Sequence, residues 1–165
     1  MGKEIILCLI LTGCGSVLGA VLPDTRTASD RAHEVEPRCK GFPEAGAAPL
    51  IAPASIEHVE PENSFVQSGN DRRANLTGAR IYLVPMASQS SETITRSLEC
   101  HQMRATLKQV EVHDDDPYVL PGRWLDIDVH SEGDGFSVRV TTDSIADAKR
   151  VLDRAERHVT PSQAQ

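Results

Sequence analysis

The residues best suited to metal chemistry lie in the stretch ECHQM, residues 99–103. Cys100 and Met103 are three positions apart, so on a helix their sulfur atoms lie side by side. Thiolate and thioether groups are soft ligands that suit Cu(I) and other thiophilic ions. His101 lies about a quarter-turn away and would complete such a site only from its edge. Because Cys and Met are also common core residues, the more ordinary interpretation of this spacing is a buried stripe.

A second group of polar residues alternates along a predicted strand. Asp126, Asp128 and His130 occupy every other position and therefore project from one face. A carboxylate–imidazole pair can bind a metal or transfer protons. Arg139 and Thr141 on the next predicted strand can lie opposite, which favours the simpler interpretation of a solvated face with cross-strand ion pairs.

The acidic stretch HDDDP, residues 113–117, offers consecutive carboxylates to a hard cation. It lacks the ligand spacing of a calcium-binding loop, so we interpret it as a solvated acidic loop. The sequence also shows no nucleophile elbow, no glycine-rich phosphate loop and no zinc-protease motif. These observations favour a protein that is not an enzyme and has no cofactor.

The elements that would position these residues begin near residue 77. ARIYLVPM predicts a strand, and SSETITRSLECHQMRATLKQV predicts a helix capped by Ser90 or Ser91. LDIDVH and FSVRVT alternate about a glycine-rich turn and predict a β-hairpin with one solvated face. SIADAKRVLDRAERHV predicts a final amphipathic helix, with Ser144 and Asp147 as its capping box and Ile145 on its inner stripe.

The predicted fold is therefore α+β, with element order β-α-β-β-α. Two helices would cover a three-stranded, mostly antiparallel sheet in a two-layer sandwich, which we place at residues 77–160. Residues 14–76 are rich in Pro, Ala, Glu, Ser and Gly without a persistent period, which predicts a flexible tether. Residues 161–165 are predicted to form a disordered tail.

The amino terminus carries a short apolar run, residues 5–11, followed by Leu-Thr-Gly-Cys14. This resembles the lipobox of bacterial lipoproteins. The resemblance implies a signal peptide at residues 1–13, cleavage before Cys14, and a lipidated Cys14 whose acyl chains, palmitate among them, hold the protein at the bilayer. Gly15 in place of Asp implies the outer membrane, facing the periplasm. An uncleaved anchor at residues 5–22 and a plain signal peptide cut near residue 20 remain alternatives.

The cysteines present a choice between two kinds of chemistry. If Cys8 leaves with the signal and Cys14 carries lipid, Cys39 and Cys100 remain. Two thiols in an oxidising compartment tend to form a disulfide. Such a Cys39–Cys100 bond would remove the thiolate that a soft-metal site needs.

The carboxy-terminal half, from ARIYLVPM through SLECHQMRATL to GDGFSVRVTTDSIADAKRVLDRAE, resembles a set of uncharacterised small exported proteobacterial proteins. The resemblance implies an exported α+β module without specifying an activity. The net charge of −7 argues against nucleic-acid binding, which needs a basic surface. We therefore predict a membrane-anchored envelope lipoprotein that binds an envelope protein or supports envelope structure. The alternative is a periplasmic accessory that binds a copper-type ion through Cys100, Met103 and His101.

Overall fold

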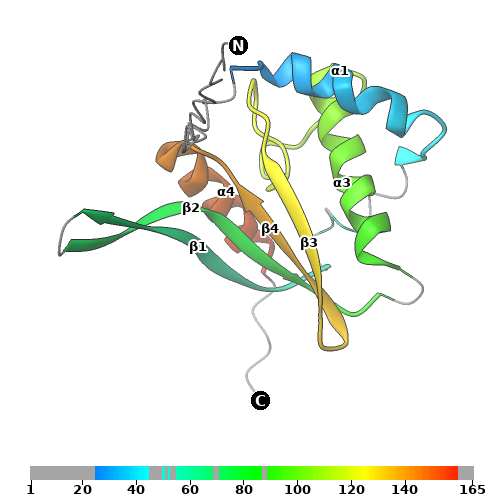
Figure 1. Cartoon of the computed structure of the whole chain (residues 1–165). Coiled ribbons are helices and arrows are strands. Elements are labelled where there is room, and N and C mark those ends of the chain that lie inside the picture. The colour runs from blue at the N-terminus through cyan, green and yellow to red at the C-terminus, as the bar shows by residue number, and fades with distance from the viewer. Residues whose placement is uncertain are drawn as a thin grey trace, which may run out of the picture.

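The computed structural model describes residues 25–44, 50, 52, 55–68, 71–86 and 89–159. The predicted signal peptide, the lipidated Cys14 and the predicted tail at 161–165 lie outside these residues. The described residues form three helices and one sheet, whose arrangement Figure 1 shows. In chain order the elements are α1 (Ala28–Cys39), β1 (Ile56–Ser68), β2 (Asp71–Leu83), α3 (Ser91–Thr106), β3 (Asp126–Glu132), β4 (Gly135–Thr141) and α4 (Ile145–His158).

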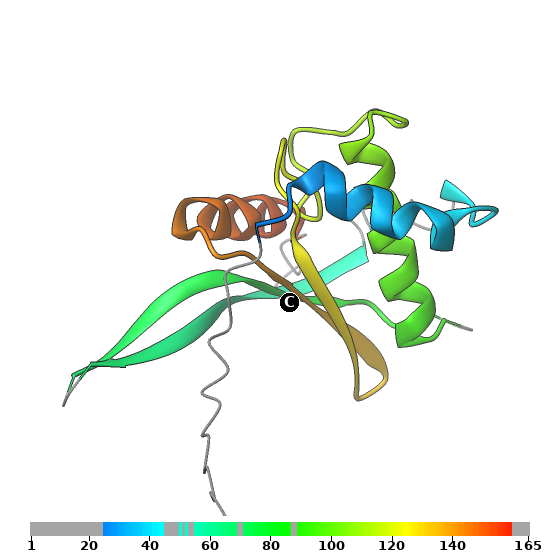
Figure 2. The same cartoon turned by 45° about the horizontal axis from the view of Figure 1, so that its top comes forward.

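The sheet has four strands in the order β1-β2-β4-β3, and every neighbouring pair is antiparallel. Helices α3 and α4 lie on one face of the sheet, with α4 against β2 and β1 and α3 against β3 (Figures 1 and 2). The main core lies between these layers and is aliphatic apart from the buried Tyr118. The α+β class is confirmed, but the prediction of three strands is wrong because it missed β1.

The β3–β4 hairpin matches its sequence pattern. Val129 pairs with Val138 and Ile127 with Val140 on the inner side. The turn between the strands includes Gly133 with a φ of +55°, a backbone conformation that glycine adopts at little cost. Alternation of apolar and polar residues therefore predicted both strands, and the structure gives their register.

Gly78 pairs with Thr141 at one end of the β2–β4 ladder. A Cβ atom at this position would come 1.8 Å from the carbonyl oxygen of Val140, so no larger residue fits without moving backbone. Gly78 is thus required by the approach of two strands. Residues of β2 that precede Gly78 do not pair with β4.

The prediction of a flexible tether through residue 76 is wrong for much of that segment. Thr27 and Asp30 form a capping box that begins α1, and Ala32, Val35 and Cys39 form its buried side. Strand β1 pairs along its length with β2. Pro37 interrupts the helical pattern of α1, and Pro61 interrupts the strand pattern of β1. Both elements are therefore stabilised by the distant segments that they contact rather than by their local sequence.

Helix α3 is buried on two sides. Its Ile94 and Leu98 face the main core. Its Cys100 and Met103 face α1 and belong to a second apolar cluster. Helix α1 therefore forms an extra helical layer outside α3, beyond the two layers that were predicted (Figure 2).

Helix α4 is present where it was predicted, but its buried side differs from the predicted inner stripe. Ser144 caps it by accepting a hydrogen bond from the backbone N–H of Asp147, and Ala148, Val151 and Ala155 are buried. Ile145, which was predicted to lie on the inner stripe, is 60% exposed. In the first turn the buried residues are Asp147 and Ala148, and Ile145 lies on the other side of the helix, where it meets solvent.

Candidate functional site

The residues of the predicted soft-metal site have other roles in the structure. Cys100 forms a disulfide with Cys39, with an S–S distance of 1.99 Å. The pairing that the sequence left open is therefore present, and the thiolate is not available to a metal. Met103 packs beside the disulfide in the apolar cluster between α1 and α3. Among the described residues, no group of three or more His, Cys, Asp and Glu side chains is arranged to hold a metal ion.

His101 lies in a buried ionic cluster instead. Its exposed fraction is only 2%, and its ring lies between two carboxylates. Nδ1 is 2.6 Å from Oε1 of Glu44, and Nε2 is 2.7 Å from Oδ2 of Asp116. Arg104 donates from the next turn of α3 to Glu44 at 2.6 Å. Since each ring nitrogen faces an acceptor, the geometry suits an imidazolium that donates in both directions.

The balance of forces on His101 favours the charged ring. Burial opposes the charged form, but hydrogen bonds and charge from Asp116 and then Glu44 outweigh it and raise the pKa of His101 above its ordinary value of 6.5. With two cations and two carboxylates, the cluster of His101, Arg104, Glu44 and Asp116 is electrically balanced. His101 and Asp116 are its buried members, and together the four residues join α3 to the segment after α1 and to the loop before β3.

The interpretation of residues 113–117 as a solvated acidic loop is therefore wrong for one carboxylate, that of Asp116. Asp116 is 4% exposed, and besides binding His101 it accepts a hydrogen bond from the backbone N–H of Tyr118. Asp115 keeps a half-exposed side chain, 3.5 Å from the ring of His158. Asp114 is exposed. Of these three aspartates, only Asp116, which points toward His101 of α3, is buried in the protein interior.

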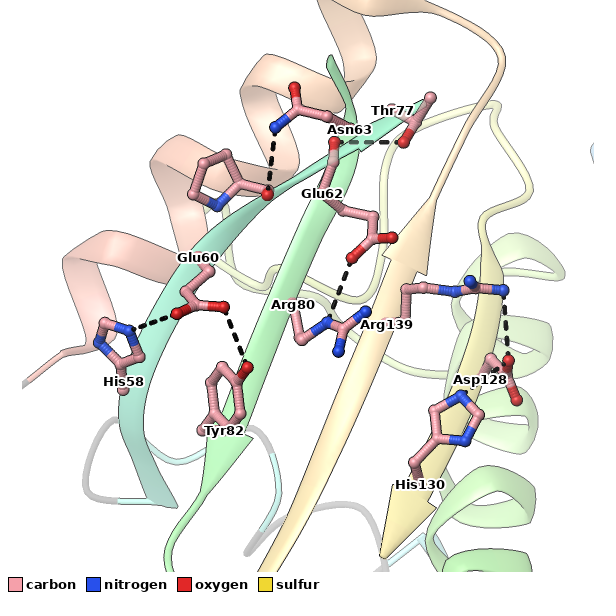
Figure 3. Close-up of polar contacts among 11 residues, drawn as sticks. His58, Glu60, Glu62, Asn63, Thr77, Arg80, Tyr82, Asp128, His130 and Arg139 are labelled. Carbon is pink, nitrogen blue, oxygen red and sulfur yellow. Dashed lines mark hydrogen bonds and ion pairs between the residues drawn. The ribbon is translucent and has the colours of Figure 1, made fainter. Parts of the chain in front are cut away.

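The second predicted group, Asp126, Asp128 and His130, lies on the face of the sheet opposite α3 and α4. The register places side chains from all four strands on this open face, as Figure 3 shows. Three of them, Asp128, His130 and Arg139, were recognised in the sequence. The others come from the β1–β2 pair and are His58, Glu60, Glu62, Arg80 and Tyr82.

These side chains form short networks across the strands. Glu60 accepts from the hydroxyl of Tyr82 at 3.0 Å and lies 3.4 Å from the ring of His58. Glu62 accepts from Nε of Arg80 at 3.2 Å. The networks continue across β4 and β3, so the open face carries a lattice of paired charges rather than a single cluster of one sign (Figure 3).

On β3 and β4, Asp128 lies 3.1 Å from Nε2 of His130 and 3.3 Å from a guanidinium nitrogen of Arg139. This satisfies the predicted cross-strand ion pair. Asp126 is drawn away from it, since it pairs with Arg31 of α1 at 2.9 Å. The structure thus brings Asp128 and His130 together and separates Asp126 from them.

The open face shifts the proton equilibria of its own residues. The hydrogen bond from Tyr82, and then the one from His58, lowers the pKa of Glu60. Burial, followed by the hydrogen bond to Glu60, raises the pKa of Tyr82. The hydrogen bond to Glu62 raises the pKa of Arg80. All three shifts favour the paired forms, with Glu60 as carboxylate and Tyr82 as phenol, so the face keeps its charge pattern near neutral pH.

The arrangement is suited to contact with a polar surface. Each residue sits on a paired strand, so the backbone fixes its position, and alternating acids and bases present hydrogen-bonding groups in a set order.

Compared with known proteins, the chain matches no family model, no curated protein and no solved structure. No helix in the described part of the chain is long and apolar enough to cross a bilayer.

The sequence contains two signals of the ionic cluster around His101. His101 shares the inner stripe of α3 with Ile94 and Leu98, and a polar ring at a core position requires polar partners. The acidic residues of 113–117 were the obvious candidates. The residues of β1 were harder to recognise, because Pro61 and the register shift between Glu62 and Asn63 break the alternation that identifies a strand.

Proposed function

We propose that the protein is an exported, lipid-anchored binding module of the bacterial cell envelope, and that the open face of the sheet contacts its partner there. The observation that carries the proposal is the disulfide between Cys39 and Cys100. Disulfides of this kind form in oxidising compartments and are rare in the cytosol. The bond agrees with the export that the apolar run and Cys14 predict.

The open face supports the binding part of this proposal. Among the described residues no helix covers this face, whereas α3 and α4 cover the other one (Figure 1). Its charges are distributed over four strands and paired with one another, which favours recognition of a complementary polar protein surface over capture of a single ion. The soft-metal alternative has lost its support, because its thiolate is in the disulfide.

The anchor is tested by intact mass spectrometry of protein extracted from the membrane fraction. We expect the mature chain to begin at Cys14, to carry acyl chains and to contain the Cys39–Cys100 bond. A Cys14→Ser variant should be neither processed nor acylated at this position. If that variant matures and fractionates with membranes as the parent does, the anchor proposal fails.

The binding face is tested by photo-crosslinking in intact cells. A benzophenone amino acid at Tyr82 lies on the open face beside Glu60, as Figure 3 shows, and the same group at Glu156 lies on the exposed side of α4. We expect a discrete adduct from position 82 and none from position 156. Equal labelling from both positions, or none from either, would contradict the assignment of the face.

A further inference from the structure

The β1–β2 hairpin extends well beyond the rest of the sheet. Strand β2 pairs with β4 only from Gly78 to Leu83. From Asn63 to Ser68, β1 pairs with the amino-terminal half of β2, which has no second strand beside it among the described residues. We call this two-stranded part, residues 63–68 and 71–76, the β-arm. Both views show it projecting away from the helices (Figures 1 and 2).

The two halves of β1 differ in how their outer edge is protected. The half beside the body, residues 56–62, contains Glu57, Glu60, Glu62 and Pro61. Charged residues and proline on an edge strand discourage pairing with another chain. The half in the β-arm reads NSFVQS and contains neither a charge nor a proline. Protection therefore ends where the β-arm begins.

The β-arm also exposes apolar surface. Phe65 is 60% exposed and Val66 is 51% exposed, and both belong to the edge strand. The guanidinium of Arg72 lies 4.1 Å from the centre of the Phe65 ring, on the side of β2. A two-stranded ribbon in water is marginal by itself and gains stability from a third strand or a packed face. The outer edge of β1 is where such a strand can add.

We propose that residues 63–68 of β1 pair antiparallel with the same segment of a second copy of this chain, forming a two-fold symmetric dimer. The segment is compatible with itself because its side chains carry no charge, so no like charges face one another. Antiparallel pairing also places Glu62 of each copy beyond Ser68 of the other, outside the paired region. An isologous contact of this kind closes after two subunits and covers the β1 edge of both β-arms.

The dimer is tested with the full-length mature protein in intact cells, with a benzophenone amino acid replacing Phe65. The expected result is a crosslinked product of twice the chain mass. The matched control carries the same group at Ile145, which is equally exposed at 60% but lies on α4. It should give no such product. Adducts to lipid only, adducts to a protein of another mass, or no adduct at position 65 would each overturn the proposal.

A charge in the pairing segment provides the second test. In a chain that keeps the position-65 crosslinker, Val66→Lys places a cation in both paired strands and should reduce the double-mass product by about tenfold or more. Ile145→Lys makes the same chemical change elsewhere and should leave it unchanged. Circular dichroism of each variant shows that the fold is retained. An undiminished product with Val66→Lys would refute the proposed pairing. These outcomes do not depend on which partner contacts the open face.

Discussion

Two histidine–carboxylate pairs in this protein have the same chemistry and opposite surroundings. His101 and Asp116 lie 2.7 Å apart with side chains that are each 3% exposed. His130 and Asp128 lie 3.1 Å apart with side chains that are 56% and 52% exposed. In the buried pair, removal of either partner leaves a charge without water. In the exposed pair, water replaces the missing partner, so the pair is free to serve recognition instead of stability.

The largest difference is expected when each carboxylate is removed. Asp116→Ala leaves the His101 ring without its buried acceptor and the backbone N–H of Tyr118 without a partner. We expect the free energy of unfolding to fall by about 3 kcal/mol, measured by urea denaturation. Asp114→Ala removes an exposed acid from the same loop and serves as the control, with a change within about 0.5 kcal/mol. Similar losses in both variants would show that Asp116 contributes no more to the free energy of unfolding than an exposed carboxylate does.

The pH dependence of stability should sharpen the comparison further. The pKa of His101 is raised on folding, so its protonated form stabilises the folded state. This stabilisation is complete below the ordinary pKa of about 6.5 and is lost as the pH rises through the higher value of the folded state. Urea denaturation across this range should therefore show a fall in stability at alkaline pH that is smaller in His101→Gln. The same pH dependence in both proteins would contradict the prediction.

The interior also contains a buried polar group, the hydroxyl of Tyr118, that forms no hydrogen bond within the described part of the chain. The hydroxyl of Tyr118 is buried without a hydrogen-bond partner there, and burial raises the pKa of this phenol. Tyr118→Phe removes the unsatisfied hydroxyl and keeps the ring. We expect the free energy of unfolding to stay equal or to rise by about 1 kcal/mol. A loss of stability in thermal or urea denaturation would indicate a partner for the hydroxyl.

The smallest effect on stability is expected at the exposed pair. Asp128→Ala should change the free energy of unfolding by about 0.5 kcal/mol or less, because surface ion pairs contribute little. If the open face binds the proposed partner, the same variant should weaken the adduct formed from position 82. A destabilisation as large as that of Asp116→Ala would remove the distinction between the two pairs.

Local pattern was sufficient for the carboxy-terminal half of the fold. The alternation in β3 and β4 predicted the hairpin, and Ser90 and Ser144 begin α3 and α4 as their capping preferences indicate. The amino-terminal half was mispredicted because its elements depend on distant partners. Helix α1 is fixed by a disulfide that spans 61 positions, and β1 by pairing with β2 despite Pro61.

The sequence by itself determined the alternating strands, the helix caps, the acidic balance and the presence of two cysteines able to pair. Only the tertiary structure decided that α3 is buried on two sides, that Asp116 turns inward to His101, and that an uncharged half of β1 projects with no further strand beside it in the described part of the chain. The physical reason is that periodicity records which face of an element is apolar. It does not record which distant segment will cover that face, or leave it open.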